Sequence, residues 1–329
     1  MFSEGRVTRG LLGLAVGAGL CYCAYRVLRT TDRKQKHVRR GGGLLEKVAN
    51  IPVLDSVTPR SPVAAEQVSV ANLEPHHLEV LLETLRSCPA DSSAQEQVLV
   101  TLCNCAAFSS NHDIIRKLNG LQIIGMFLKD HRPNIKEKAL NALNNLSMNL
   151  QNQEQIKDFL GDVCSDIKSS LLNSEVQLAG LRLVVNMSVT NNYHDSLTEY
   201  ITCFLDVLVR GNENTQSHTL KVLVNLSANP SMTTVLLSSK VPLSLTNLYD
   251  SNTNTDILIR ALTFAANLSE NLGRELHCNG HCHYEDDSLY SLLLRDQSVF
   301  QGNLLALLHH PDTNVREQLA RIVCPQRLT

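Results

Sequence analysis

A repeat of about 40 residues is the feature that most restricts how this chain of 329 residues can fold. Five segments share an apolar helical run that closes in Asn, and in four of them an apolar residue and Ser follow the Asn. The shared residues, spaced 41, 41, 39 and 42 positions apart, are Asn104, Asn145, Asn186, Asn225 and Asn267. A fixed period of this length indicates stacked helical units, each of which buries its apolar side against its neighbours.

The segment 113–148 indicates how one unit is built. Its sequence DIIRKLNG predicts a short helix ended by Gly120, LQIIGMFLKD a second helix, and HRPNIKEKALNALNNLSM a turn and a long third helix. A glycine suits the position after a helix end, because positive φ costs it little. This layout resembles the armadillo repeat. It implies an all-α, right-handed armadillo-repeat solenoid over residues 72–329, with about six units, incomplete ends and an insertion at about 272–290.

Residues 1–30 predict a single-pass membrane anchor with its span at about residues 7–28. No residue between Arg9 and Arg26 is charged. As a helix, this stretch of sixteen residues would be about 24 Å long, so residues on both sides are needed to cross a hydrocarbon core of about 30 Å. The anchor residues are Leu11, Leu12, Leu14, Val16, Leu20, Tyr22 and Tyr25. A cleaved secretory signal is the alternative for the same stretch.

A basic block follows the apolar stretch and predicts on which side of the membrane the body lies. It consists of Arg26, Arg29, Arg33, Lys34, Lys36, Arg39 and Arg40. Positive residues stay on the cytosolic side, so the body is expected in the cytosol, and each adds about 1 kcal/mol of attraction to an anionic membrane surface. Residues 31–71, with three consecutive glycines and three prolines, predict a linker that is first basic and then flexible.

The charge of the chain is uneven, which bears on its partners. Residues 1–40 carry a net charge of +7 while the whole chain carries −2, so the remainder carries −9. An acidic body argues against nucleic-acid binding by the array. Gly13 and Gly17 form the small-xxx-small pattern of some transmembrane dimers, so homo-association is a further hypothesis.

The shared Asn residues are candidates for a partner groove. In armadillo proteins the third helices line such a groove, and an Asn there can hold the backbone of a bound peptide. The alternative is structural, because Asn and Ser also end helices. One turn before the Asn, nuclear-import armadillo adaptors carry Trp, which this chain lacks entirely. The predicted groove residues are Asn104, Asn145, Arg182, Asn186, Lys221, Asn225 and Asn267.

Arg182 and Lys221 each lie one turn before a shared Asn. They resemble the basic lining of armadillo grooves that take acidic, extended or helical partners. The alternative for both is a solvated cation on a helix surface.

Motifs for catalysis are absent from the sequence. It contains no GxxxxGK[ST], HExxH, GxSxG or GxGxxG, so no catalytic residue and no cofactor is predicted. One loop concentrates thiol and imidazole groups that could bind Zn²⁺. Its weak metal candidates are Cys278, His281, Cys282 and His283, and an exposed polar loop is the alternative.

A closer resemblance rests on IKEKALNALNNLS and on VQLAGLRL followed by NMSVTN. Together with the anchor, the basic flank and the linker, these segments resemble the mitochondrial armadillo repeat-containing proteins, a family that includes the X-linked armadillo proteins. The resemblance implies a protein of the mitochondrial outer membrane, or of the endoplasmic reticulum in some settings, with its array in the cytosol. It implies contacts with the Miro GTPase and kinesin adaptors, and a role in mitochondrial distribution, dynamics and cell growth or survival.

The leading functional prediction is a non-enzymatic, membrane-anchored adaptor that binds protein partners. A second hypothesis is a soluble nuclear or cytosolic armadillo co-regulator of transcription, in which the N-terminal segment is a localisation signal. A third is a zinc-dependent activity at residues 277–283.

Overall fold

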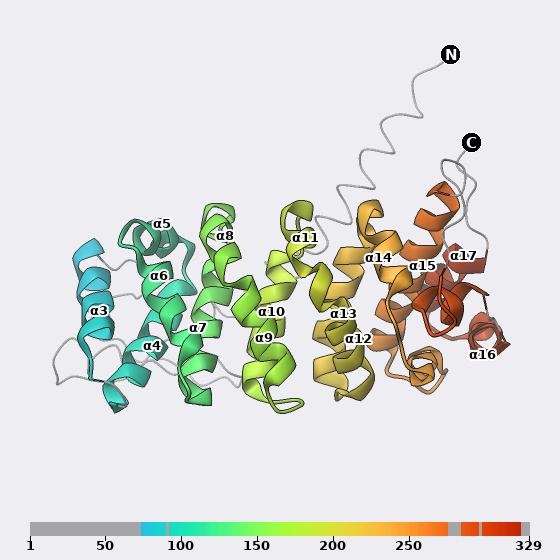
Figure 1. Ribbon diagram of the computed structural model, residues 1–329, viewed down its shortest axis with the longest axis horizontal. Coiled ribbons are helices and arrows are strands. Elements are labelled where there is room, and N and C mark those ends of the chain that lie inside the picture. Colours follow the sequence, from blue (N-terminus) through green and yellow to red (C-terminus); the bar gives the residue numbers. More distant parts are fainter. Residues whose placement is uncertain (1–73, 90–91, 276–283, 296–297, 324–329) are drawn as a thin grey trace, which may run out of the picture. The chain divides into compact units, whose positions relative to one another are not determined.

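The computed structural model describes residues 74–89, 92–275, 284–295 and 298–323. Its helices belong to one compact unit, Val70–Thr329, and follow one another from the first repeat to the last (Figure 1). They group into six repeats of two or three helices, as the period of the sequence predicts. Within the described ranges, strand-like pairing is limited to an isolated bridge between Lys240 and Ser288.

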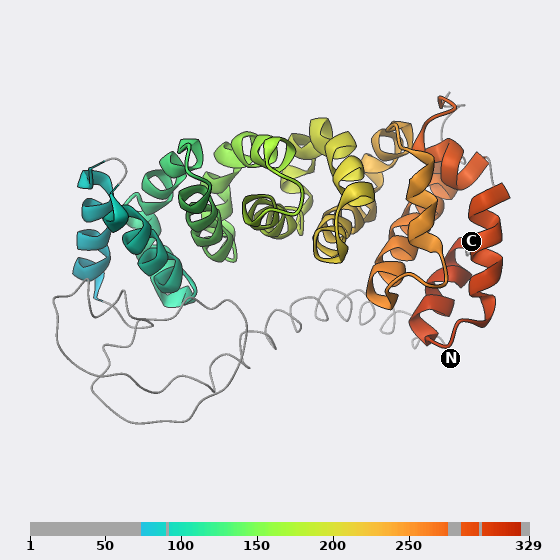
Figure 2. The same ribbon diagram turned by 90° about the horizontal axis from the view of Figure 1, so that it is seen from below.

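The third helices carry the shared Asn residues and form a continuous row, because each packs on the next. Figure 2 shows the row from another side. The helices are α4 (Ser93–Ala106), α7 (Pro133–Leu146), α10 (Glu175–Met187), α13 (Glu213–Ala228), α15 (Thr255–Glu275) and α17 (Thr313–Val323). Helix α15 continues past residue 272, where the insertion was expected to begin.

The first and second helices of each repeat are shorter. The first helices are α5 (Ser109–Lys117), α8 (Leu150–Ile156), α11 (His194–Leu197) and α14 (Thr233–Ser238). The second helices are α3 (Pro75–Ser87), α6 (Gly120–Gly125), α9 (Leu160–Ser169), α12 (Ile201–Arg210), the 3₁₀ helix η7 (Leu243–Tyr249) and α16 (Ser298–Ala306). A π-helix, η8 (Ser291–Arg295), precedes α16. Short 3₁₀ turns join several of these elements: η2 (Met126–Lys129), η3 (Lys157–Phe159), η4 (Asn191–Tyr193), η5 (Thr198–Tyr200), η6 (Pro230–Met232) and η9 (Leu307–His309).

The core repeats with the same period as the shared Asn. Apolar residues five and two positions before each Asn and one position after it share a helix face, because they are three residues apart. All of them are buried in one cluster: Leu99, Leu102, Cys105, Leu140, Leu143, Leu146, Leu181, Val184, Met187, Leu220, Leu223, Leu226, Leu262, Ala265 and Leu268. Burial of a Leu side chain contributes about 1.5–3 kcal/mol, so this stripe stabilises the stacking of the repeats.

Gly120 has a different role from the one that the sequence predicted. Helix α5 ends at Lys117, and the left-handed residue that follows is Asn119, with φ of 59°. Gly120 is instead the first residue of α6, and a Cβ there would lie 2.6 Å from Ile115 Cγ2 and 2.8 Å from the Ile115 carbonyl oxygen. Asn tolerates positive φ better than most residues, so the glycine serves close packing between α5 and α6.

Side chains of the next repeat satisfy the last carbonyl groups of several third helices. Asn111 Nδ2 donates to the Cys105 carbonyl at 2.9 Å, and Asn152 Nδ2 donates to the Leu146 carbonyl at 3.0 Å. At the following position, Gln153 Nε2 donates to the Ser147 carbonyl at 2.8 Å. His112 and His194 bond equivalent carbonyls at 2.7 and 2.8 Å, those of Ala106 and Ser188. These polar residues are buried, so each repeat completes the end of the previous one.

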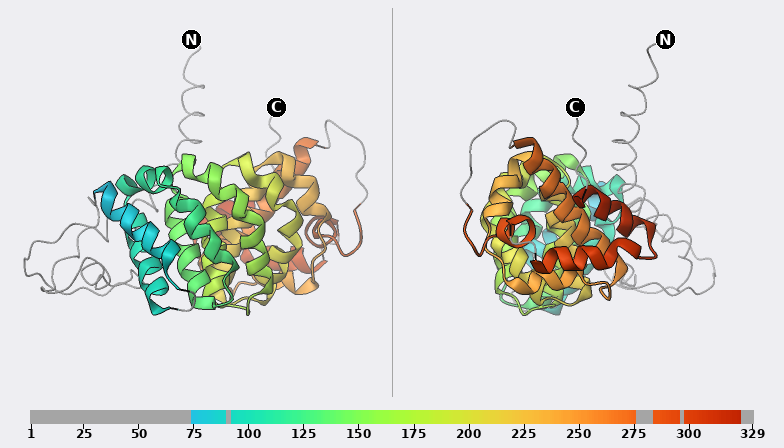
Figure 3. Two further views of the ribbon diagram at one scale, coloured as in Figure 1. Left: turned by 60° about the vertical axis from the view of Figure 1, so that its left-hand side comes forward. Right: turned by 90° about the vertical axis from the view of Figure 1, so that its right-hand side faces the viewer.

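The last third helix has a polar outer side. Five positions before the shared Asn, the earlier third helices carry a buried Leu, whereas Arg316 of α17 is exposed and bonds the carbonyls of His310 and Pro311. Figure 3 shows α16 and α17 at the C-terminal end of the row. An exposed cation suits a helix side that none of the described helices covers.

We expect Gly120→Ala to lower the free energy of unfolding by about 1–3 kcal/mol, since the new methyl group overpacks the α5–α6 contact. Gly161→Ala is the matched control, because a Cβ there meets nothing closer than Tyr200 Oη at 3.7 Å and alanine favours the helix by up to about 1 kcal/mol. Thermal unfolding of both variants checks this. Equal unfolding temperatures would contradict the packing role of Gly120.

Candidate functional site

The residues predicted to form a groove all lie on third helices. Asn104 is on α4, Asn145 on α7, Arg182 and Asn186 on α10, Lys221 and Asn225 on α13, and Asn267 on α15. Positions seven and four residues before each shared Asn and the Asn itself lie within a narrow arc of the helix, since one turn takes 3.6 residues. We call the surface formed by these positions the third-helix face.

The shared Asn residues connect neighbouring repeats through their amide nitrogen atoms. Asn145 Nδ2 donates to the Cys103 carbonyl at 3.1 Å. Asn186 Nδ2 donates to the Asn144 carbonyl at 3.2 Å and to Ser147 Oγ at 3.0 Å.

The next two rungs repeat the pattern. Asn225 Nδ2 reaches the Val185 carbonyl at 3.4 Å and Ser188 Oγ at 3.0 Å. Asn267 Nδ2 reaches the Val224 carbonyl at 3.5 Å and Ser227 Oγ at 3.1 Å. The Ser of the first three Asn-x-Ser triplets, Ser147, Ser188 and Ser227, therefore accepts a hydrogen bond from the Asn of the following repeat. We call this series the Asn ladder.

The ladder ends at a residue that sequence reasoning missed. Arg321 of α17 donates from Nη2 to Asn267 Oδ1 at 2.8 Å. It also pairs with Glu270, Nε to Oε1 at 2.8 Å and Nη2 to Oε2 at 3.0 Å. Arg321 stands two residues after the buried Leu319, which is the register of the shared Asn in the earlier third helices. An alignment on the buried leucines would have found it, whereas a search for Asn could not.

The ladder leaves a second set of atoms unused. The Nδ2 atom donates to the preceding repeat in Asn145, Asn186 and Asn225. Their Oδ1 atoms accept no hydrogen bond from the residues that the structure describes. The Nδ2 atoms of the ladder therefore hold the repeats together, whereas these Oδ1 atoms can still accept a hydrogen bond. Contact of these Asn residues with a bound peptide stays a prediction.

Arg182 and Lys221 lie in a cluster of cationic side chains on three adjacent helices. The sequence analysis missed His218 on α13 and Arg260 on α15, each seven residues before a shared Asn, because only the position four residues before was considered. Lys221 is half-buried and makes no hydrogen bond or ion pair with any described residue. Burial lowers the pKa of its ammonium group, and Arg260 and Arg182 lower it further against an opposing effect of Asp256.

The remaining members of the cluster are also weakly neutralised. The nearest Arg182–Glu175 contact, Nη2 to Oε2, is 3.9 Å, and the carboxylate is largely exposed. Arg260 donates from Nη1 to the backbone carbonyl of Asp256 at 2.7 Å. Burial lowers the pKa of His218, and the three nearby cations lower it further, although its hydrogen bond to the Asn214 carbonyl has the opposite effect. We call Arg182, His218, Lys221 and Arg260 the cationic cluster.

Apolar residues stand at or just after the C-terminal ends of four third helices. Three residues after the shared Asn stand Ala107, Met148, Val189 and Ala228 in four consecutive repeats, and all of them are exposed. Met148 is 52% and Val189 61% exposed. We call these four residues the apolar row.

Several predicted sites lie outside the described residues. They are the anchor at residues 1–30, the basic flank and the linker up to residue 71, together with the zinc candidates of the 277–283 loop. Across the described ranges, the structure contains no helix long and apolar enough to cross a membrane. The same ranges bring together no group of three His, Cys, Asp or Glu side chains suited to a metal ion.

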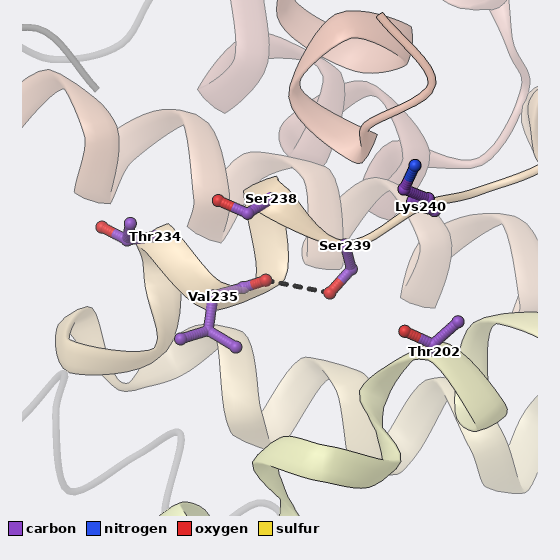
Figure 4. Close-up of a pocket in the computed structure, with 6 residues that line it drawn as sticks. All are labelled: Thr202, Thr234, Val235, Ser238, Ser239 and Lys240. Atoms are coloured by element: carbon purple, nitrogen blue, oxygen red, sulfur yellow. Dashed lines mark hydrogen bonds between the residues drawn. The ribbon is translucent and has the colours of Figure 1, made fainter. Parts of the chain in front are cut away.

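A shallow cavity of about 500 Å³ lies between α12 and α14. Figure 4 shows its lining, which consists of Thr202, Thr234, Val235, Ser238, Ser239 and Lys240. Ser239 Oγ donates to the Val235 carbonyl at 2.9 Å. Hydrogen bonds to Glu285 and Asp287 raise the pKa of the Lys240 ammonium group, and the two carboxylates balance its positive charge. The cavity contains no residue of the predicted groove.

Comparison with known proteins agrees with this architecture. Residues 73–294 match the family model described as Armadillo-like. An engineered protein of a structural genomics consortium superposes with a TM-score of 0.62 at 17% identity, over 75% of this chain and 57% of its own. A designed armadillo repeat protein gives 0.60 at 15% identity, over 75% and 98% of the two chains.

A further designed armadillo repeat protein, solved in complex with the peptide (KR)4, gives a TM-score of 0.60 at 14% identity, again over 75% of this chain and 98% of its own. The chain thus spans little more than half of the first engineered protein and nearly all of the two designed ones. At such low identities the likeness shows the fold alone, an all-helical armadillo-repeat solenoid.

We expect Asn186→Ala to lower the free energy of unfolding by about 1–3 kcal/mol, because it removes the amide that donates to Ser147 Oγ and to the Asn144 carbonyl, which then keeps only its hydrogen bond from Ser147 Oγ. Asn192→Ala, at an exposed position between α10 and α11, should change it by less than about 0.5 kcal/mol. Chemical denaturation of both variants measures the difference. A loss at Asn192 as large as that at Asn186 would rule out the ladder as a source of stability.

Proposed function

The chain belongs to the armadillo-like family, and we propose that it is a membrane-tethered scaffold that recruits acidic protein partners to its third-helix face. Armadillo repeat proteins bind peptide and protein partners and are typically not enzymes. The tether, the charge of the partner and the cellular role go beyond the family, and each has its own support and its own test.

The observation that carries the charge of the partner is the unpaired cation on the third-helix face. Other half-buried cations have a carboxylate close by. Examples are Arg116 with Asp113 at 2.8 Å, Arg132 with Asp130 at 2.7 Å and Lys138 with Glu137 at 3.0 Å. Among the described half-buried cations, Lys221 and Arg260 have no carboxylate within 4.0 Å. A partly desolvated charge without a counter-charge is costly, so the carboxylates of a partner would relieve that cost.

The tether is proposed from the sequence. A charge-free stretch at residues 10–25, followed by seven basic residues within residues 26–40, supports a single span with the array in the cytosol. The resemblance to mitochondrial armadillo proteins supports the mitochondrial outer membrane, with the endoplasmic reticulum as the alternative. It also supports the Miro GTPase and kinesin adaptors as partners, and a role in mitochondrial distribution, dynamics and cell growth or survival.

Charge reversal on the third-helix face tests the scaffold. We expect Arg182→Glu combined with Lys221→Glu to reduce partner binding in a quantitative pull-down at least tenfold. Each reversal replaces attraction to an acidic partner by repulsion, which weakens the binding free energy by on the order of 1 kcal/mol at a partly exposed site. The matched control is Lys117→Glu with Lys168→Glu, which reverses two exposed lysines of α5 and α9.

Both double variants must unfold at the same temperature as the unmodified chain, so that a change in capture is due to binding and not to loss of folding. Equal capture by the unmodified chain and by the Arg182–Lys221 variant would remove the third-helix face from the function.

The tether is tested on mitochondria from cells that express the chain with a C-terminal tag. We expect the tag to stay in the pellet after alkaline-carbonate extraction, because a helix through the bilayer resists extraction. Protease should digest the tag without detergent, because the array faces the cytosol. Release of the tag by carbonate would favour the soluble co-regulator, and a tag shielded from protease would favour a luminal or secreted chain.

A further inference from the structure

The outer side of α16 is apolar and exposed at the C-terminal end of the helix row (Figure 3). Val299, Gly302 and Ala306 are spaced three and four residues apart, so they share one face of the helix. Leu305 borders this face, and all four residues are exposed. Val299 is 60% and Leu305 65% exposed. We call these four residues the α16 face.

The opposite side of α16 is apolar as well. Phe300 and Leu304 are buried, and the ring of Phe300 meets that of Tyr249 in η7 edge to face, with the ring centroids 4.8 Å apart. No residue from Val299 to Ala306 is charged. A helix that is apolar on all sides is normally buried on all sides. The α16 face is therefore a contact surface that no described residue covers.

The other second helices have polar outer sides. On α12 the exposed residues are Thr202, Asp206 and Arg210, and on α9 they include Ser165 and Lys168. Asp206 and Arg210 also pair with each other. A second helix that faces water in this array thus has hydroxyl or charged groups outside, and the α16 face departs from that pattern.

The α16 face also continues a series of contacts between repeats. At α6, the ring of Phe159 from the following repeat fills the space that a Cβ of Gly125 would take. At α9, Tyr200 Oη of the following repeat lies 3.7 Å from the Cβ position of Gly161. At Gly302, nothing in the described protein lies within 4 Å of that position beyond its own neighbours and helix backbone. The row of second helices can therefore be extended at α16.

A second copy of the chain is the occupant that this face fits. Head-to-tail extension by another array is disfavoured, because α3 at the other end of the row exposes Glu79, Glu83 and Arg86. The α16 face matches itself, since it has no charge that would meet its like across a two-fold axis. Gly302 lacks a Cβ, which lets two helix backbones approach closely. A two-fold contact closes after two copies and leaves no open end.

We propose that the chain forms a two-fold dimer in which α16 packs against α16 of a second copy, with Gly302 near the axis. The contact contains no residue of the third-helix face, so the dimer presents two cationic clusters. Two linked faces bind a partner with two acidic segments more tightly than one face does. The dimer goes beyond the proposed function and does not depend on it.

The size of the contact determines where the dimer forms. One helix of nine residues on each copy buries less than the about 800 Å² per partner that is usual in stable interfaces. The dimer is therefore weak in dilute solution. Confinement to one membrane by the proposed anchor raises the effective concentration of the chain, so the dimer is tested in cells.

The test uses the full-length chain with Gly302→Cys, expressed with two different tags and treated in intact cells with a short, membrane-permeant bismaleimide. A residue near a two-fold axis meets its own copy, so we expect about tenfold more cross-linked dimer with both tags than from the unmodified chain. The ten cysteines of the unmodified chain give the background. Ser165→Cys, on the exposed side of α9, is the matched control and should stay at that background.

A second set of variants assigns the contact to the α16 face. Val299→Glu with Leu305→Glu, added to Gly302→Cys, should lower the yield of cross-linked dimer about tenfold, because the dimer would bury carboxylates without a counter-charge. Both side chains are exposed in the single chain, so its thermal unfolding should not change. Ser165→Glu adds a carboxylate to α9 and should leave the cross-linking of Gly302→Cys unchanged.

Other outcomes would overturn the dimer. One is a yield from Gly302→Cys no higher than that from Ser165→Cys. Another is a dimer that survives the two Glu substitutions, because the copies would then meet elsewhere, for example through the predicted anchor. A cross-linked product with one tag alone would assign the α16 face to a different protein. In all three cases, partner capture that still depends on Arg182 and Lys221 would leave the proposed function in place.

Discussion

The array depends on one constraint, which is that the end of each third helix needs the following repeat. The last carbonyl groups of a helix have no donors within it. Here Asn145, Asn186 and Asn225 each donate to such a carbonyl, and Asn267 donates to the Val224 carbonyl near the end of α13. Buried side chains of the next first helix, such as Asn152, satisfy others. Since a lost buried hydrogen bond costs about 1–3 kcal/mol, each of these repeats stabilises its predecessor, and the apolar stripe adds to the same contact.

This dependence explains why the C-terminal end of the row differs from its middle. Helix α17 has no successor among the described helices, and it exposes Arg316 where the earlier third helices bury a Leu. Its Arg321 still completes the repeat before it, but through a guanidinium that bonds Asn267 Oδ1 and Glu270 in place of an amide. The last described repeat thus donates hydrogen bonds to the repeat before it and has a polar outer side.

Much of this fold could be predicted from the sequence, because its period and its apolar spacing are local patterns. The third helices and the position of the shared Asn follow from them. Gly120 shows the limit, since φ preference and close packing both favour a glycine, and only the contact with Ile115 distinguishes them. Arg321 shows another, because a different residue fills the place of the Asn. The cationic cluster could not be found from the motif, because His218 and Arg260 are recognised only as spatial neighbours of Lys221.

Stability and binding meet in the same amide groups of the ladder. Each Asn holds the preceding repeat through Nδ2, which fixes the direction of its Oδ1, so the acceptor row is already ordered before a ligand arrives. Preorganised groups lose little entropy on binding. The cations beside them act in the opposite sense, because Lys221 is partly desolvated without a counter-charge in the described protein and so reduces stability. A face shaped for folding alone would pair this lysine, as Lys138 is paired with Glu137. An acidic partner would therefore bind to a face that is rigid in its hydrogen bonds and unneutralised in its charge, and its binding would stabilise the array in proportion to its affinity.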